Sequence, residues 1–142
     1  MEEIRNSRLN KLQKLKGAGI NPYPAKVPRD FDIVLLKKSF TEFEKNKKEI
    51  SIAGRIMAIR GQGAILFAVL FDGTEKFQTI FKKDELDEKW FSLFVDTADM
   101  GDFISVTGPA ITSERGEPSI LVKSWTMATK SLLPLPDKWE GL

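Results

Sequence analysis

Hydrophobic residues recur with a helical period over the first 46 residues, apart from a proline-rich interruption. A first helix is predicted over residues 2–16, because its apolar positions fall on one side of a helix and basic residues fill the other side. Those apolar positions are Ile4, Leu9, Leu12 and Leu15. Residues 19–28 contain three prolines and are expected to form an extended connector. A second helix, capped by Asp30, is predicted to reach Asn46.

From Glu49 onward, short apolar runs separated by turn residues indicate β-strands. A helix capped by Asp84 is predicted over residues 84–95, between the third and fourth runs. The strands are expected over residues 49–60, 64–72, 75–82, 102–112 and 118–128. Three strands, one helix and two closing strands follow one another in the order of an oligonucleotide-binding (OB) barrel. The predicted fold is therefore mainly β with flanking α: a five-stranded OB barrel with a helix between strands 3 and 4, preceded by N-terminal helices.

The second predicted strand is apolar on both faces, although only one face of a strand can line a barrel interior. Phe67 lies on one face with Ile65 and Val69, while Leu66 and Ala68 lie on the other. Two interpretations are open. Either the N-terminal helices cover the outer face, or this face presents an aromatic ring on which a flat ligand such as a nucleic-acid base stacks.

The third predicted strand places a polar residue beside this ring. Phe77 and Phe81 alternate with Gln78, so the glutamine points out of the barrel when the aromatic residues point into it. A glutamine on an outer face is ordinarily a solvent-facing residue. It becomes a candidate ligand-binding residue here because Phe67 and the turn that contains Arg60 are its predicted neighbours.

The composition excludes several kinds of chemistry. The 142 residues contain no cysteine and no histidine, which excludes disulfides, thiolate zinc sites and thiol nucleophiles and removes the usual general base near pH 7. No catalytic residue and no metal ligand is assigned, and no cofactor is expected in this chain. The longest apolar run, residues 64–71, is too short to cross a bilayer, and the N-terminus lacks the pattern of a signal peptide. A cytoplasmic location without a membrane partner is expected.

The net charge of +2 hides an uneven distribution. Residues 1–60 contain 14 Lys and Arg against 7 Asp and Glu, whereas residues 61–142 contain 8 against 13. A basic first part can attract a polyanion such as a nucleic acid to one side of the molecule. The same charges are more often those of solvated helix faces, so charge alone does not decide between the two interpretations.

Three groups of residues together indicate a family. The leading helix and connector contain Arg8-Leu9-Asn10-Lys11-Leu12 and Gly19-Ile20-Asn21-Pro22-Tyr23-Pro24. The barrel contains Ala53-Gly54-Arg55-Ile56-Met57-Ala58-Ile59-Arg60, Leu66-Phe67-Ala68, Phe77-Gln78 and Gly116-Glu117. The C-terminal segment contains Leu133-Pro134-Leu135-Pro136-Asp137-Lys138 and Gly141-Leu142. This set resembles the N-terminal anticodon-binding domain of class II lysyl-tRNA synthetases over essentially the whole chain. The barrel residues are also similar to those of aspartyl and asparaginyl synthetases, so the connector and the C-terminal segment carry the lysyl assignment.

The resemblance implies that the domain reads the anticodon of a lysine-type tRNA. By that resemblance, Phe67 stacks on the central anticodon base, a uridine that is splayed out of the loop. Gln78 and Arg60 would donate hydrogen bonds to its carbonyl oxygens or to adjoining backbone. Glu117 would accept from the N3–H group, which cytosine lacks. Cytosine would then leave a carboxylate facing a lone pair, so discrimination would come from an unpaired buried group.

The basic side of the first predicted helix is a candidate surface for contacts with the RNA backbone. Its basic residues are Arg5, Arg8, Lys11 and Lys14. A helix whose charges are merely solvated is the alternative.

The predicted organisation has three parts: a helical extension over residues 1–48, the OB-fold anticodon-binding domain over 49–130, and a linker over 131–142 towards a catalytic domain that this chain lacks. The resemblance implies that the parent protein is an ATP-dependent lysine-tRNA ligase and a homodimer, with ATP and Mg²⁺ bound by the absent domain. This chain alone is then expected to be inactive.

The sequence leaves other functions open. A free-standing OB module would bind single-stranded nucleic acid without sequence preference, which requires several stacking aromatic residues spread over the outer sheet. A protein-interaction barrel would use the basic helix and Phe67 to contact a partner chain. An enzyme acting alone is disfavoured, because histidine and cysteine are absent and no carboxylate pair has a catalytic spacing.

Overall fold

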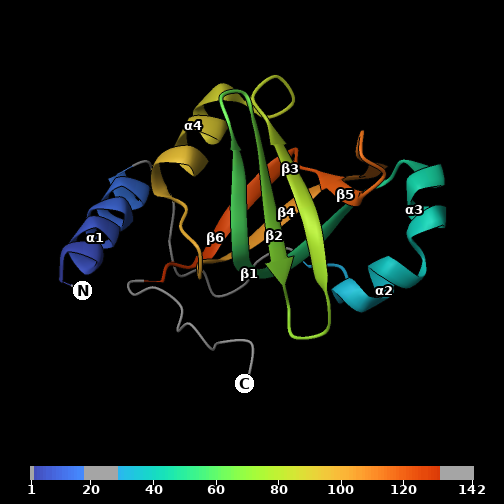
Figure 1. Cartoon of the computed structure of the whole chain (residues 1–142), viewed down its shortest axis with the longest axis horizontal. Helices are drawn as coiled ribbons and strands as arrows, with labels where there is room; N and C mark the ends of the chain where they lie inside the picture. The colour runs from blue at the N-terminus through green and yellow to red at the C-terminus, as the bar shows by residue number, and fades with distance from the viewer. Residues whose placement is uncertain (1, 18–28, 132–142) are drawn as a thin grey trace.

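The computed structural model describes residues 2–17 and 29–131 and shows a β-barrel with helices at two flanks (Figure 1). The strands are β1 Glu49–Gln62, β2 Ile65–Phe71, β3 Lys76–Lys82, β4 Phe103–Thr112, β5 Pro118–Leu121 and β6 Ser124–Thr129. The helices are α1 Glu2–Gly17, α2 Ile33–Lys38, α3 Phe40–Asn46 and α4 Glu88–Thr97. The predicted connector over 19–28 and, apart from Ser131, the predicted linker over 131–142 lie outside the described residues.

The strands close into a ring in the order β1–β2–β3–β5–β4, with β4 pairing back onto β1. The β3–β5 pair is parallel, and the other pairs are antiparallel. β6 continues along β4 beyond the end of β5. With α4 between β3 and β4, this ring confirms the predicted five-stranded OB barrel.

The alternation of side chains decides what fills the barrel. Ala68 and Leu70 of β2 and Phe81 of β3 point inward and are fully buried. Phe94 of α4 stacks on Phe81 with 3.9 Å between the ring centres, so the helix packs directly onto the barrel core. The odd-numbered residues of β2, including Phe67, are left on the outside.

The second predicted helix was wrong in two respects. It is two short helices, α2 and α3, separated at Ser39. Asp30 does not cap it, because its backbone N–H donates to the Ser51 carbonyl and its carboxylate accepts from the Ser51 N–H. The first N–H groups of α2 find their acceptors in the β2–β3 hairpin instead. Ile33 N–H donates to the Asp72 carboxylate at 2.8 Å, and Val34 N–H donates to the Thr74 hydroxyl at 3.2 Å.

Two other predicted boundaries are corrected. The helix between β3 and β4 is capped by Asp87, whose carboxylate accepts from Lys89 N–H, and begins at Glu88, because residues around the predicted cap Asp84 form a turn. The predicted last strand over 118–128 is divided into β5 and β6. The division lies where the Leu121 carbonyl approaches Gly108 so closely that a Cβ at position 108 would be 1.9 Å from its oxygen.

The described helices lie at the two flanks of the barrel and leave the outer face of β1–β3 uncovered (Figure 1). α1 packs against α4 on one flank, and α3 packs against β4 on the other. The interpretation in which N-terminal helices cover the outer face of β2 is therefore wrong for the described helices. None of the described helices is long and apolar enough to cross a membrane.

Asp72 is the residue that fastens α2 to the barrel. Partial burial raises the pKa of its carboxyl, but hydrogen bonds from the Ile33 N–H, the Thr74 hydroxyl and N–H and the Glu75 N–H outweigh burial and hold that pKa below its ordinary value. The ionised carboxylate is therefore the form that the folded protein favours.

Replacing Asp72 by alanine is expected to lower the free energy of unfolding by about 1 kcal/mol, because the first turn of α2 loses its acceptor. Chemical denaturation at neutral pH measures the loss. Since folding lowers the pKa of Asp72, its contribution is present above the unfolded-state pKa and should disappear as the pH falls through the folded-state pKa. Asp84→Ala removes an exposed aspartate that caps no helix and should unfold like the wild type; equal losses in both variants would contradict the capping role.

Candidate functional site

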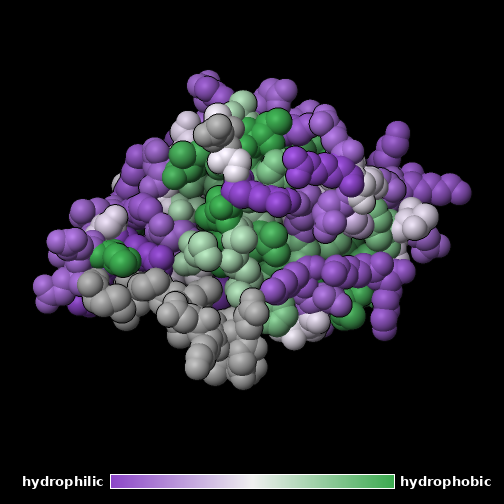
Figure 2. Space-filling view, in the orientation of Figure 1, coloured by the Kyte–Doolittle hydropathy of each residue, from purple (hydrophilic) through white to green (hydrophobic). Residues whose placement is uncertain are grey.

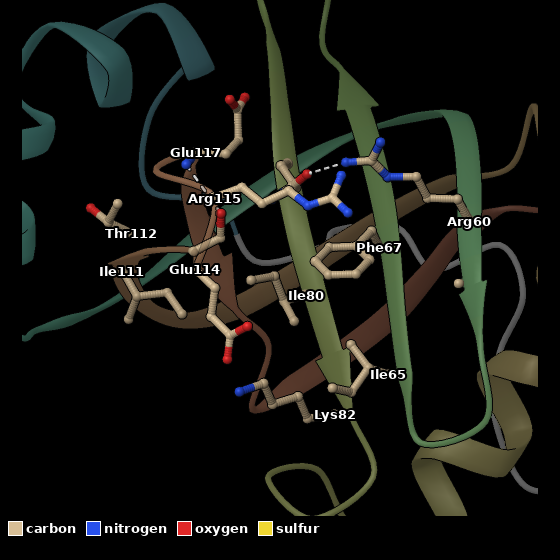
Figure 3. Close-up of a pocket in the computed structure, with 13 residues that line it drawn as sticks. Arg60, Ile65, Phe67, Ile80, Lys82, Ile111, Thr112, Glu114, Arg115 and Glu117 are labelled. Carbon is tan, nitrogen blue, oxygen red and sulfur yellow. Dashed lines mark hydrogen bonds between the residues drawn. The ribbon is translucent and has the colours of Figure 1, made fainter.

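The uncovered outer face is hollowed where β2 and β3 meet the loop between β4 and β5, residues 113–117. Two adjoining hollows lie there, with volumes of about 460 and 360 Å³. Figure 2 shows hydrophobic side chains gathered over this face, with hydrophilic side chains around them. The residues common to both hollows are Arg60, Phe67, Gln78, Arg115 and Glu117. The four barrel residues that the resemblance selects therefore converge on one site from three strands and one loop (Figure 3).

Phe67 is half-buried and forms a wall of both hollows. Arg60 is its direct partner in the pairing of β1 with β2, and the guanidinium carbon lies 5.4 Å from the centre of the ring. On the other side, β3 places Ile80 opposite Phe67, which gives the larger hollow an apolar floor. An accessible aromatic ring with a cation beside it is suited to a flat, electron-rich ligand.

Gln78 is held by hydrogen bonds at both ends of its amide. Its Oε1 accepts from Arg60 Nη2 at 2.9 Å, and its Nε2 donates to Ser119 Oγ at 2.8 Å. Ser119 Oγ in turn donates to the Glu117 carbonyl at 3.0 Å. Because Ser119 has a single hydroxyl proton, its donation to Glu117 requires Gln78 to present its amide nitrogen to Ser119 and its amide oxygen to Arg60. Gln78 is only 5% exposed, so the outward-facing glutamine predicted from the strand pattern is enclosed by these partners.

The loop that carries Glu117 is closed by Ser113. The Ser113 N–H donates to the Glu117 carbonyl, and the Glu117 N–H donates to Ser113 Oγ at 3.1 Å. Gly116 takes a φ of +85°, which favours glycine at that position. The Glu117 side chain is exposed, and Figure 3 shows its carboxylate at the rim, pointing away from the Phe67 ring. The backbone of the loop is thus fixed while this carboxylate is free to reorient.

Three basic residues of the site were missed by the sequence analysis. Arg115 lines both hollows, Lys82 lines the larger and Lys76 lines the smaller. Both lysines share the outward parity of Gln78 on β3, so the alternation that selects the glutamine could also have found them. Arg115 lies in a loop, where no periodicity applies, and only its nearness in sequence to Glu117 could have indicated it.

The predicted basic surface of α1 lies at the α4 flank, and none of its residues lines either hollow. Arg8 is buried, with its Nε 3.7 Å from an Asp99 oxygen. Lys11 pairs with Asp99 at 2.6 Å and Lys14 with Asp96 at 2.7 Å. Arg5 is exposed. Three of the four predicted backbone-contact residues are therefore held by carboxylates of the α4 end of the molecule.

A buried lysine completes this ion-pair network. Lys130 Nζ is fully buried, 2.6 Å from an Asp99 oxygen and 2.8 Å from an Asp102 oxygen. Burial raises the pKa of the Asp99 carboxyl, but the hydrogen bonds from Lys11 and Lys130 outweigh burial and hold that pKa below its ordinary value. The network fixes α1 onto the barrel.

Within residues 2–17 and 29–131, no group of three acidic side chains is arranged to hold a metal ion.

Comparison with known proteins identifies a family. The family described as an OB-fold nucleic acid binding domain matches residues 50–128. A lysine-tRNA ligase from Dehalococcoides mccartyi is 39% identical over 145 residues, which covers 99% of this chain and 29% of that protein. One from Roseiflexus is 34% identical over 143 residues and covers 100% of the chain and 29% of the relative. Lysine-tRNA ligase 2 from Methanosarcina mazei is 38% identical over 138 residues, with coverages of 96% and 27%. The chain thus spans less than a third of the length of these relatives.

Replacing Ser119 by alanine is expected to lower the free energy of unfolding by about 1–3 kcal/mol, because a buried amide N–H of Gln78 loses its acceptor. The same change removes the donor to the Glu117 carbonyl, so backbone amides of the 113–117 loop should exchange with deuterium faster than in the wild type. Ser124→Ala, at an exposed strand position, is the control and should leave stability and exchange unaltered. Unchanged loop exchange in the Ser119 variant would show that the hydrogen-bond chain does not hold the loop.

Proposed function

The chain belongs to the family of OB-fold nucleic acid binding domains, and on that premise we propose that it recognises a tRNA anticodon as part of a lysine-tRNA ligase. The observation that carries the proposal is the convergence of Arg60, Phe67, Gln78 and Glu117 on two adjoining hollows of an uncovered sheet face. The relatives named as lysine-tRNA ligases support the choice of tRNA, because each aligns with 96% or more of the chain.

The base that we place against Phe67 is the central uridine of the anticodon. A base splayed from the loop stacks on an accessible ring for about 1–3 kcal/mol. Stacking alone does not select uridine, since every base has a flat face. Selection requires the polar groups around the ring to match the hydrogen-bonding edge of the base.

Two side chains supply donors for the uridine carbonyl oxygens. Arg60 uses one guanidinium nitrogen on Gln78 and keeps further N–H groups for a ligand. Gln78 donates one Nε2 proton to Ser119 and has a second. The hydrogen bonds to Arg60 and Ser119 fix the orientation of the Gln78 amide. In this proposal, its second Nε2 proton is therefore oriented for the base before RNA binds, which reduces the ordering cost of binding.

Glu117 discriminates uridine from cytosine in this proposal. Its exposed carboxylate turns from the rim toward the stacked base and accepts the N3–H proton of uridine, a side-chain rotation of the kind common on complex formation. Cytosine has a lone pair at N3 and would leave the carboxylate desolvated and unpaired. The penalty for an unpaired charged group then disfavours cytosine.

The contacts of α1 with the RNA backbone are proposed in a narrower form. Arg8, Lys11 and Lys14 are engaged with Asp99 and Asp96, which neutralises much of their charge. We therefore assign any phosphate contact of this helix first to Arg5.

The remaining functions belong to the whole protein. Because the chain spans 27–29% of the length of the relatives, we propose that lysine activation, the binding of ATP and Mg²⁺ and the homodimer contacts reside in sequence beyond this region. This chain alone should not charge tRNA.

Binding of the 142-residue chain to anticodon stem-loops with UUU, UCU and CUU, at one fixed salt concentration, tests the proposal. We expect a preference for UUU over UCU, which changes the middle base, and a smaller difference for CUU. Phe67→Ala should weaken UUU binding about tenfold or more, because the stacking surface is lost. Phe71→Ala is the matched control, since Phe71 lies on the same face of β2 and lines neither hollow. Glu117→Gln should bind UUU and UCU more equally.

The other functions predict different results. Equal affinity for the three loops would indicate a module that binds single strands without sequence preference. A wild-type chain that binds none of the loops would favour the protein-interaction barrel. Equal weakening by Phe67→Ala and Phe71→Ala would place the RNA elsewhere on the sheet.

A further inference from the structure

Arg115 lies at the junction of the two hollows. It lines both of them, as do Phe67 and Arg60. Figure 3 shows its side chain extending from the 113–117 loop across β3 toward the Phe67 ring and the Arg60 guanidinium. Neither the strand pattern nor the family resemblance singles out this residue.

The two arginines concentrate positive charge at this junction. Arg60 donates to the neutral amide of Gln78, and within the described part of the chain no carboxylate forms an ion pair with Arg60 or Arg115. Lys82 lines the larger hollow and Lys76 the smaller one, and the carboxylates that line these hollows are those of Glu114 and Glu117. Two like charges directed into one groove are best accommodated by an anion between them.

The backbone that carries Arg115 is already fixed. Ser113, which precedes Arg115, forms hydrogen bonds with Gly116 and Glu117, which follow it, and Ser119 donates to the Glu117 carbonyl. A guanidinium presented from a fixed turn loses less conformational freedom on binding than one on a mobile segment. The exposed Arg115 side chain makes no hydrogen bond to a described residue, so it is available to a ligand.

The position of Arg115 matches one chemical group of an RNA strand. Phe67 and Arg115 both line the two hollows, so a strand with consecutive nucleotides in the two hollows would pass its linking phosphate over these shared residues. The planar fork of an arginine binds phosphate oxygens through two parallel hydrogen bonds. A carboxylate or a base edge would also accept from arginine, but the phosphodiester is the acceptor that an RNA strand carries between any two consecutive bases.

We propose that Arg115 binds the phosphate that links the nucleotide stacked on Phe67 to its neighbour in the adjoining hollow. The proposal rests on the proposed RNA-binding function of the site. In it, Arg115 supplies affinity that is independent of sequence and decreases with salt, whereas Glu117 and Gln78 supply the choice of base.

The test measures the affinity of the 142-residue chain for the UUU stem-loop over a series of salt concentrations. Arg115→Ala should weaken binding about tenfold at low salt, as expected for loss of a charge-assisted hydrogen bond. It should also reduce the slope of log Kd against log salt concentration by about 0.7, the value for one phosphate of a single strand. The preference for UUU over UCU should be unchanged. Arg115→Lys keeps the charge and should restore the slope, while Arg29→Ala, at another exposed arginine, should behave like the wild type.

A second measurement identifies the phosphate. Stem-loops with a single neutral methylphosphonate linkage, placed 5′ or 3′ of the central uridine, are compared for the wild type and Arg115→Ala. One of the two linkages should weaken wild-type binding by the same factor as the Arg115→Ala substitution, and should weaken the variant no further.

Three results would overturn the assignment. An unchanged salt slope in Arg115→Ala would exclude a phosphate contact by this residue. A lost preference at the middle base would make Arg115 a base-reading residue. Additive losses from the variant and both neutral linkages would place the phosphate elsewhere. If the wild-type chain binds no stem-loop, the proposed function falls as well; if it prefers UUU and only the Arg115 results fail, the proposed function stands.

Discussion

The hydrogen-bond chain from Arg60 through Gln78 and Ser119 to the Glu117 carbonyl is the constraint on which the site depends. It joins β1, β3 and β5 on the outside of the barrel, and two of its members are buried. A buried polar chain of this kind stabilises one arrangement only when every member is satisfied. Here each of the three bonds has a matched donor and acceptor, so the Gln78 amide and the Ser119 hydroxyl each have one orientation, while Arg60 and Gln78 keep further N–H groups for a ligand. The parallel pairing of β3 with β5, which closes the barrel, makes this hydrogen-bond chain possible because it places Gln78 beside Ser119.

The described helices lie at the flanks of the barrel and leave the outer face of β1–β3 accessible. The ion-pair network of Asp99 with Lys11 and Lys130 holds α1 at the α4 flank, and Asp72 holds α2 at the opposite side. Separating buried ionic partners is costly, so this network keeps α1 at the flank and away from the sheet. The outer face of β2 is therefore available as an aromatic surface. Charged groups at the flanks are thus engaged in packing, whereas Arg60 and Arg115 at the hollows form no ion pair with a carboxylate of the described residues.

The sequence predicted the barrel better than it predicted local connections. Alternation along β2 and β3 placed Phe67 and Gln78 on the outer face, because the period of a strand is fixed by its pleat. Asp30 failed as a helix cap because it pairs with β1 in space, which no local pattern contains. The burial of Arg8 depends in the same way on carboxylates about 90 residues away in sequence. Arg115 was missed because a loop side chain has no periodicity, and its position depends on how the turn folds back over β3.

The most direct test of the account is an NMR study of the chain bound to the UUU stem-loop, with the Phe67 ring and the central uridine isotopically labelled. The account predicts intermolecular nuclear Overhauser effects between the Phe67 ring protons and the H5 and H6 protons of that uridine. It also predicts that the Gln78 side-chain amide keeps its hydrogen-bonded shift. Intermolecular effects confined to α1 or α4, with none at Phe67, would contradict it.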